Sequence, residues 1–162
     1  MFIQLNSLPR TADAFQQQLQ ISQKSPYGTT ALLLAALHLY PDDNELALSI
    51  IDALKGGHGL SDEERAFIRL SLTGSEYLPD SYWDGATPTN NYTPRIPYTL
   101  SFTDTLEMDA PGRLSIFLIS NGAKDPREVV LKEAAGRWFL ADWTNVLLEV
   151  RPPASGKRAS KS

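Results

Sequence analysis

The stretch Tyr77 to Tyr98, YLPDSYWDGATPTNNYTPRIPY, separates two halves of the chain with different sequence patterns. It holds four prolines, with one tryptophan and four tyrosines interleaved between them. Prolines at this density exclude a helix, and a strand can begin only at the end of the stretch. A mobile linker would not leave so much aromatic surface in water. We therefore predict an ordered connection between a helical first half and a stranded second half.

Helix signals precede this stretch. Ser61 and Glu64 have the spacing of a capping box, which marks a helix start. The segment ALLLAALHLY, residues 31–40, is apolar nearly all round, as expected of a helix in the middle of a core. Ser25-Pro26 is expected to end the first helix, and Gly28 to open the second. The predicted helices span residues 11–23, 29–40, 43–55 and 61–72.

Strand signals follow it. From Ile96 onward apolar and polar residues alternate, and LSIFLI, residues 114–119, is apolar on both faces. The predicted strands span 96–103, 113–120, 128–134 and 137–143. A turn is expected to hold Asp104, Glu107 and Asp109, and the segment 145–150 reads equally as a helical turn or a strand. Helices followed by an antiparallel meander indicate an α+β fold, with the helices covering one face of about four strands. The predicted shared core comprises Leu33, Leu37, Ile50, Phe67, Ile116, Leu118 and Trp138.

Composition limits the classes of function. The chain has 162 residues, a net charge of −4 and no cysteine, which excludes a disulfide framework, a thiol nucleophile and a cysteine metal site. Residues 1–150 carry 11 Lys and Arg against 19 Asp and Glu, a charge of −8. Such an acidic body argues against nucleic acid as the ligand. We predict one domain over residues 1–153 and a disordered basic tail over 154–162.

No membrane or secretion signal is evident. Residues 1–5, MFIQL, lack the basic flank and long apolar run of a signal peptide. The longest apolar run, residues 31–37, is far shorter than a membrane span. A cytoplasmic protein that does not bind membranes is expected.

Six segments form a distinctive pattern: SPYGTTALLLAALHLYPDD from Ser25, LKGG at residues 54–57, YWDGATPTNNYTP at 82–94, SNGAKDPR at 120–127, GRWFL at 136–140 and VRPP at 150–153. Together they resemble an uncharacterised bacterial family, a domain of unknown function. The likeness covers about residues 25–153. It implies a common fold and supplies no reaction, cofactor or partner. One departure is Lys124, where the family pattern has an acidic residue, and this weakens any cation site at that turn.

The two histidines are weak catalytic candidates. His38 lies in the apolar second helix and is expected to be a core or helix-end residue. His58 lies in Gly56-Gly57-His58-Gly59, where it is either an exposed general base or part of a loop that follows a helix stop. The GGHG segment lacks the spacing and the Lys-Ser/Thr of a phosphate loop. A small hydrolase that uses His58 with nearby carboxylates is an alternative, although no nucleophile motif accompanies it.

Metal binding is not expected. The pairs at residues 42–43 and 62–64 lie where helix N-termini favour negative charge, so capping explains them. Asp104, Glu107 and Asp109 lack the glycine and terminal glutamate of a calcium loop. No residue is therefore assigned to a metal or to catalysis.

The central aromatics are the best binding candidates. Rings next to amide and guanidinium groups are typical of a sugar or peptide groove. We predict Tyr92 as a buried anchor and Tyr82 and Trp83 at the rim of a site. The candidate binding residues are Tyr82, Trp83, Asn90, Asn91 and Arg95.

The sequence thus favours a binding or interaction module without a cofactor, whose partner is a protein, a peptide or a small molecule. The hydrolase is one alternative. An inhibitor or immunity-type protein whose acidic face covers a basic partner is another.

Overall fold

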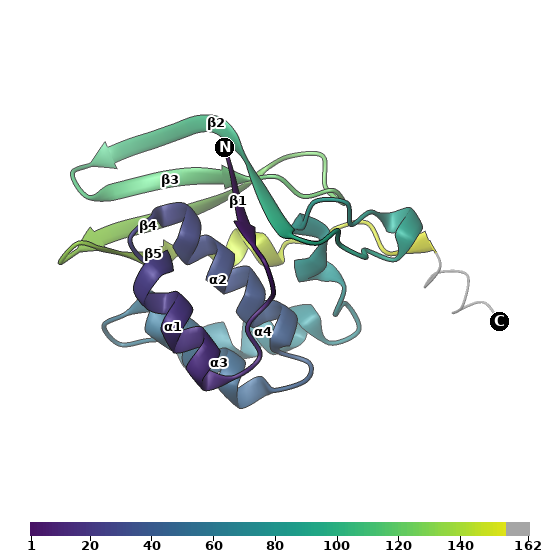
Figure 1. The fold of residues 1–162 in the computed structure, drawn as a ribbon, viewed down its shortest axis with the longest axis horizontal. Coiled ribbons are helices and arrows are strands. Elements are labelled where there is room, and N and C mark those ends of the chain that lie inside the picture. Colours follow the sequence, from purple (N-terminus) through teal and green to yellow (C-terminus); the bar gives the residue numbers. More distant parts are fainter. Residues whose placement is uncertain (155–162) are drawn as a thin grey trace.

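The computed structural model describes residues 1–154, so the predicted basic tail lies outside the described residues from 155 onward. Four helices precede most of the sheet along the chain, as the sequence predicts (Figure 1). Each starts at a side-chain cap, and those of the first, third and fourth helices are as predicted, including the capping box of Ser61 and Glu64. The helices are α1 (Ala12–Ser22), α2 (Pro26–Leu39), α3 (Asn44–Lys55) and α4 (Asp62–Leu72).

Helix α2 begins earlier than predicted. Ser25 is its N-cap, with its hydroxyl accepting a hydrogen bond from the Tyr27 backbone N–H, and Pro26 occupies the first turn. Proline suits this position because its missing N–H would have no partner there. A Cβ at Gly28 would lie 2.2 Å from the Ser22 backbone oxygen, so this glycine allows α1 and α2 to meet closely.

The sheet has five antiparallel strands in sequence order, one more than predicted. The additional strand is β1, which pairs with the start of β2 and which no local signal indicated. The strands are β1 (Phe2–Leu5), β2 (Tyr98–Ala110), β3 (Arg113–Leu118), β4 (Arg127–Ala134) and β5 (Arg137–Asp142).

Strand β2 is longer than predicted. Asp104, Glu107 and Asp109 lie within this strand and not in a turn, so that prediction is wrong. The alternation of Leu106 and Met108 with acidic residues continues the strand pattern, and β3 pairs along the segment. The turn comes only after Ala110.

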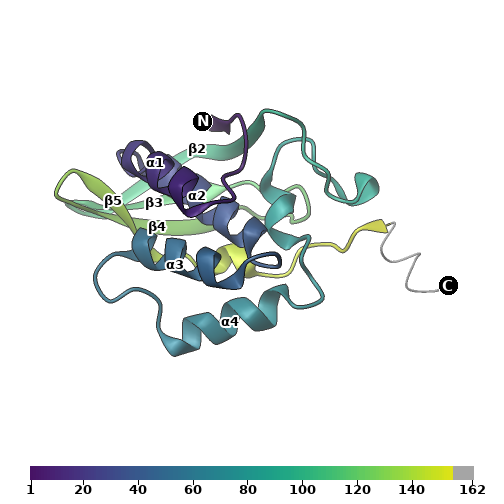
Figure 2. The ribbon, with the colours of Figure 1, turned by 60° about the horizontal axis from the view of Figure 1, so that its bottom comes forward.

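The helices pack on one face of the sheet, and in Figure 2 α3 and α4 lie below the strands, with α4 lowest. Residues 28–37 of α2 are all buried, in a core that joins the helices to the sheet.

Two core predictions need correction, because Phe67 is 37 % exposed and Trp138 is only half-buried. The ambiguous segment near 145–150 begins as a short 3-10 helix, η3 (Thr144–Leu147). The other predicted core residues, Leu33, Leu37, Ile50, Ile116 and Leu118, are buried.

Ile116 provides a test of this core. Its side chain is fully buried in β3, so Ile116→Ala is expected to lower the free energy of unfolding by about 2–5 kcal/mol, the usual range for large-to-small core changes. Urea unfolding followed by circular dichroism measures it. A loss below about 1 kcal/mol would place Ile116 outside the core.

None of the helices formed by residues 1–154 combines the length and hydrophobicity that a membrane span requires.

Candidate functional site

Tyr82 and Trp83 lie in the core. The central stretch contains a short 3-10 helix, η1 (Leu78–Tyr82), and Trp83 follows it. Trp83 is fully buried, forms a bridge to Leu100 of β2 and packs edge-on against Tyr98, with 5.8 Å between the ring centroids. The prediction that both rings lie at the rim of a site is wrong, because pairing with the sheet carries the chain after η1 into the core.

The Tyr82 phenol is held by one internal hydrogen bond. Its hydroxyl donates to the Val146 backbone oxygen at 2.7 Å. Burial raises the pKa of Tyr82 despite the nearby Arg127 charge, so the phenol stays protonated and can donate. The ring therefore joins η1 to η3.

Tyr92 is the buried anchor that the sequence predicts. It is almost fully buried and stacks on Tyr77, with 5.6 Å between the ring centroids. Its hydroxyl donates to the Arg151 backbone oxygen at 2.5 Å. A Cβ at Gly122 would lie 2.2 Å from this hydroxyl, so glycine at 122 makes room for it. Tyr92 thus fixes the central stretch to the last residues of the described chain.

The three polar candidates are exposed, whereas the rings beside them in the sequence are buried. Asn90 ends the short 3-10 helix η2 (Pro88–Asn90), and its amide oxygen accepts from the backbone N–H groups of Thr87 and Thr93. Asn91 has a left-handed backbone. Arg95 forms an ion pair with Asp84 in which both side chains are well exposed. The binding role of Asn90, Asn91 and Arg95 stays a prediction. The contacts of Asn90 and Arg95 are made within the central stretch and stabilise the loop itself.

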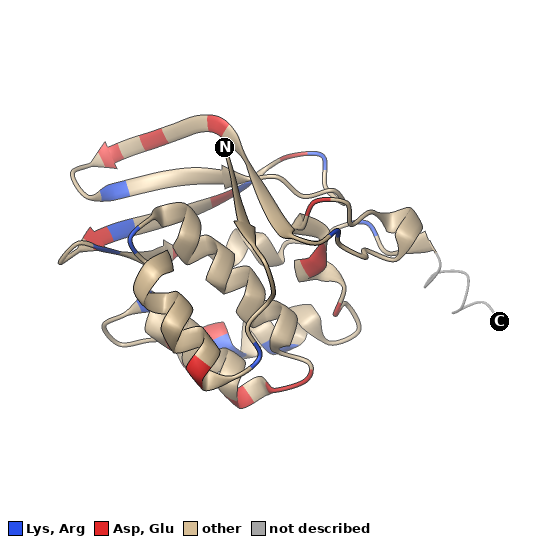
Figure 3. Cartoon of the chain, viewed as in Figure 1, with Lys and Arg blue, Asp and Glu red and all other residues tan. Residues whose placement is uncertain are grey.

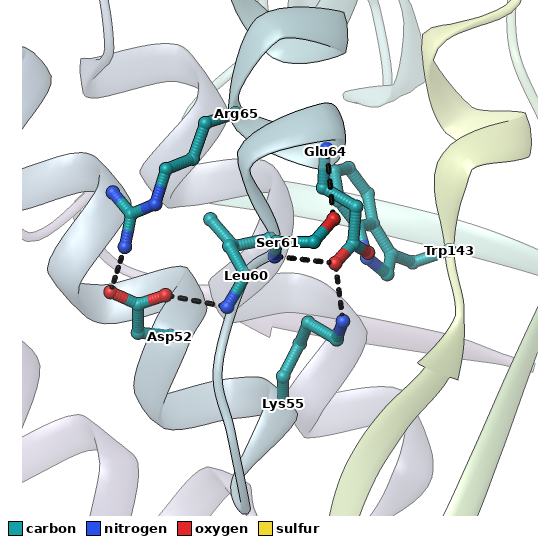
Figure 4. Close-up of polar contacts among 7 residues, drawn as sticks. All are labelled: Asp52, Lys55, Leu60, Ser61, Glu64, Arg65 and Trp143. Carbon is teal, nitrogen blue, oxygen red and sulfur yellow. Dashed lines mark hydrogen bonds and ion pairs between the residues drawn. The ribbon is translucent and has the colours of Figure 1, made fainter.

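Loop 56–59 (GGHG) is fixed at both ends by polar contacts (Figure 4). The Asp52 carboxylate in α3 accepts hydrogen bonds from the Leu60 backbone N–H and from Arg65, each at 2.7 Å. In α4, Glu64 accepts from Lys55 at 2.5 Å. These contacts tie the end of α3 to the start of α4, so the loop between them is held on a rigid base.

Glu64 is the centre of this network. Besides Lys55, it accepts hydrogen bonds from the Ser61 backbone N–H and from the Trp143 indole, each at 3.0 Å. Partial burial acts to raise the pKa of Glu64, but these hydrogen bonds and the Lys55 charge lower it by more. The pKa of Glu64 therefore lies below its ordinary value, and the folded protein favours the carboxylate.

This pKa predicts an acid-dependent loss of stability. A lowered folded-state pKa stabilises the fold above the unfolded-state pKa, and that stabilisation is lost as the pH falls through the folded-state value. Glu64→Gln is expected to be less stable than the wild type at about pH 7 and to lose less stability between about pH 5 and pH 3. Thermal melts over this range test it, with exposed Glu63→Gln as control. The prediction would be contradicted if the melting temperatures of Glu64→Gln and of the wild type fell in parallel as the pH is lowered.

His58 is exposed at the tip of the loop, and its ring has no hydrogen-bond partner among residues 1–154. Hollows of about 340 and 440 Å³ flank the loop, and no hydroxyl or thiol side chain lines either of them. A histidine base in nucleophilic catalysis acts on a neighbouring nucleophile and is oriented by a third group. The hydrolase alternative gains no support from this arrangement.

His38 lies in the last turn of α2, at the helix end as expected. Its Nδ1 is 2.7 Å from an Asp80 carboxylate oxygen, which fastens η1 to α2. Within the described chain, no group of three or more His, Asp or Glu residues is placed to hold a metal ion.

The second half of β2, residues 103–110, has a free edge. Strand β1 pairs only with residues 98–101, and no other described strand lies on that side. Figure 1 shows this half as the upper border of the sheet, away from the helices. Backbone N–H and C=O groups on such an edge are available to pair with another strand.

The two faces of this free edge differ in chemistry. Leu106 and Met108 lie opposite the buried Ile116 and Leu114, so they point to the helix side of the sheet, yet they are 53 % and 62 % exposed. Acidic residues lie along the same segment (Figure 3). Glu107 and Asp109 alternate with the apolar pair and therefore point to the opposite face.

The opposite border of the sheet is covered. The Trp138 backbone N–H in β5 donates to the Gln23 oxygen at 2.7 Å, and its oxygen accepts from the Thr29 hydroxyl at 2.9 Å. The connection between α1 and α2 thus hydrogen-bonds to the β5 edge at Trp138, whereas the second half of β2 has no such contact on its free side with another described segment. This edge was missed because its acidic residues suggested a turn, although the alternation in TLEMDA, residues 105–110, is a strand signal.

Comparison with known families adds one finding. The model of a family described as "Domain of unknown function (DUF6935)" matches residues 7–154. The chain belongs to this family. Membership in DUF6935 confirms the expected relation to a domain of unknown function and extends it to α1, which precedes the segments on which the resemblance rested. Comparisons with curated proteins and with solved structures give no significant match.

Proposed function

We propose that the protein is an interaction module that binds an extended segment of a partner protein along the free edge of β2. The observation that carries this proposal is that the pairing of β2 with β1 ends at Ser101 of β2, leaving residues 103–110 open on one side. A partner strand would gain backbone hydrogen bonds there, which is how peptides add to exposed sheet edges in known recognition modes.

The side chains define the partner. In an added strand, alternate residues would lie beside Leu106 and Met108 on one face and beside Glu107 and Asp109 on the other. The proposal therefore requires a segment that alternates apolar residues with Lys or Arg. The proposal thus joins two expectations from the sequence: a binding module, and an acidic face that covers a basic partner.

A second copy of the chain is a poorer candidate for the strand that pairs with this edge. Two β2 edges placed side by side would bring Asp104, Glu107 and Asp109 of both copies together, and like charges on neighbouring strands are destabilising. The cations near this edge compensate little. The Met1 amine and Arg113 are 3.5 and 3.6 Å from Asp104 and Asp109, in exposed pairs of small energetic value.

Selection from a random peptide library tests the proposal without knowledge of the natural partner. The expected result is enrichment of peptides in which Lys or Arg alternate with apolar residues. Enriched peptides without this alternation, or ones that bind a Leu106→Ser/Met108→Ser variant as well as the wild type, would contradict it. A cytoplasmic location and function without a cofactor stay predictions.

A further inference from the structure

We propose that loop 56–59, together with β3 and β4, forms a separate site for a phosphate group. A pocket of about 340 Å³ lies between the loop and the end of the sheet at β5. Four basic side chains line it, from Lys55, His58, Arg113 and Lys132, and no acidic side chain does. In a chain with a net charge of −4, such a grouping favours an anionic ligand.

Two of these cations lie side by side on neighbouring strands. Arg113 in β3 and Lys132 in β4 are direct cross-strand partners, and like charges in this arrangement are destabilising. Arg113 is 3.6 Å from Asp109, and Lys132 forms no ion pair with a described residue. An anion between the two side chains would replace their repulsion with two attractive contacts.

Lys55 contributes less charge. Its ammonium group is bound to Glu64, so most of the attraction in the pocket must come from Arg113 and Lys132. These two residues lie far along the chain from the loop. The cations that the GGHG sequence lacks are thus supplied by the sheet.

The loop backbone adds hydrogen-bond donors. Gly56, Gly57 and Gly59 have φ angles of 64°, 53° and 68°. The backbone N–H groups of Gly57 and His58 have no acceptor within residues 1–154. Free N–H groups in turns that contain left-handed residues form concave anion sites in other proteins. The contacts of Asp52 and Glu64 hold this loop in place before any ligand binds.

The shape of the pocket indicates the kind of phosphate. Leu140 and Ala141 form an apolar part of the lining, and the volume of about 340 Å³ exceeds what a bare phosphate occupies. Several donors around one group suit the three oxygens of a phosphate monoester better than a carboxylate. A phosphate carried on a small organic group is therefore the expected ligand class, with inorganic phosphate as the simpler source of the same chemistry.

The test is an NMR titration of the whole protein with inorganic phosphate, glycerol phosphate and acetate at constant ionic strength. Both phosphates are expected to shift the amide signals of residues 56–59, and acetate to bind at least about tenfold more weakly. Tighter binding of glycerol phosphate than of inorganic phosphate would support an organic monoester, and equal binding would support free phosphate.

Variants decide whether the pocket is responsible. Lys132→Gln and Arg113→Gln are each expected to weaken phosphate binding about tenfold, the effect of one charge-assisted hydrogen bond. Lys124→Gln, an exposed cation in the turn between β3 and β4, is the matched control and should bind as the wild type does. Absence of shifts in loop 56–59, equal binding of acetate, or equal losses in Lys124→Gln and Lys132→Gln would overturn the proposal.

Discussion

Replacing Trp83 by alanine is expected to lower the free energy of unfolding by about 3–5 kcal/mol, the range for truncation of a large buried aromatic side chain. The indole is fully buried and contacts Tyr98 edge-on, and its backbone bridges to Leu100. Alanine would leave a cavity at the junction between the helices and the sheet. Urea unfolding of the two proteins measures the difference.

Tyr92→Ala is expected to have a loss of similar size, because it removes the stack on Tyr77 and the hydrogen bond to Arg151. Arg95→Ala, at an exposed ion pair in the same stretch, should change stability by less than about 1 kcal/mol. At temperatures where the variants stay folded, all three should bind the selected peptides as the wild type does. If the folded Trp83→Ala variant bound the peptides more weakly than the wild type, the binding site would lie in the central stretch and not at the β2 edge.

The second large effect concerns the acidic face of the β2 edge. The double variant Glu107→Lys/Asp109→Lys is expected to bind the selected basic peptides about tenfold to a hundredfold more weakly, because two attractive rim pairs become repulsive. The affinity of the wild type should fall as salt is added, and that of the variant should not. Isothermal titration calorimetry at two salt concentrations measures both.

Glu45→Lys/Glu63→Lys is the matched control for charge. It makes the same change of four charges at two exposed residues, one in α3 and one in α4, away from the free edge. Its affinity for the peptides is expected to equal that of the wild type. Equal losses in this variant and in the β2 variant would show that only net charge matters, and the free edge would lose its role.

The helices could be predicted because their signals are local. The Ser61–Glu64 capping box, the Asp43 cap and the apolar segment of α2 each lie within a few residues of the element they define. Strand β1 could not be predicted in this way. It consists of four residues, and its stability comes from pairing with Tyr98 to Ser101, a segment far away along the chain.

The candidate sites were harder to predict for the same reason. The burial of Tyr82 and Trp83 depends on partners in η3 and β2, and proline-rich sequence has no period from which a buried side can be inferred. The pocket beside loop 56–59 takes its cations from β3 and β4, so no local spacing rule could identify it. Only the free half of β2 has a local sequence pattern that predicts it, the alternation of apolar and polar residues over 105–110.

Amide hydrogen exchange along β2 shows whether a partner strand pairs with the free edge. In the free protein, the backbone N–H groups of residues 103–109 that point away from β3 should exchange rapidly, because no described strand pairs with them. A bound selected peptide is expected to slow their exchange at least about tenfold, while the amides of the covered β5 edge stay unchanged. Protection of the β5 edge or of the central stretch, with no change in residues 103–109, would contradict binding at the free edge of β2.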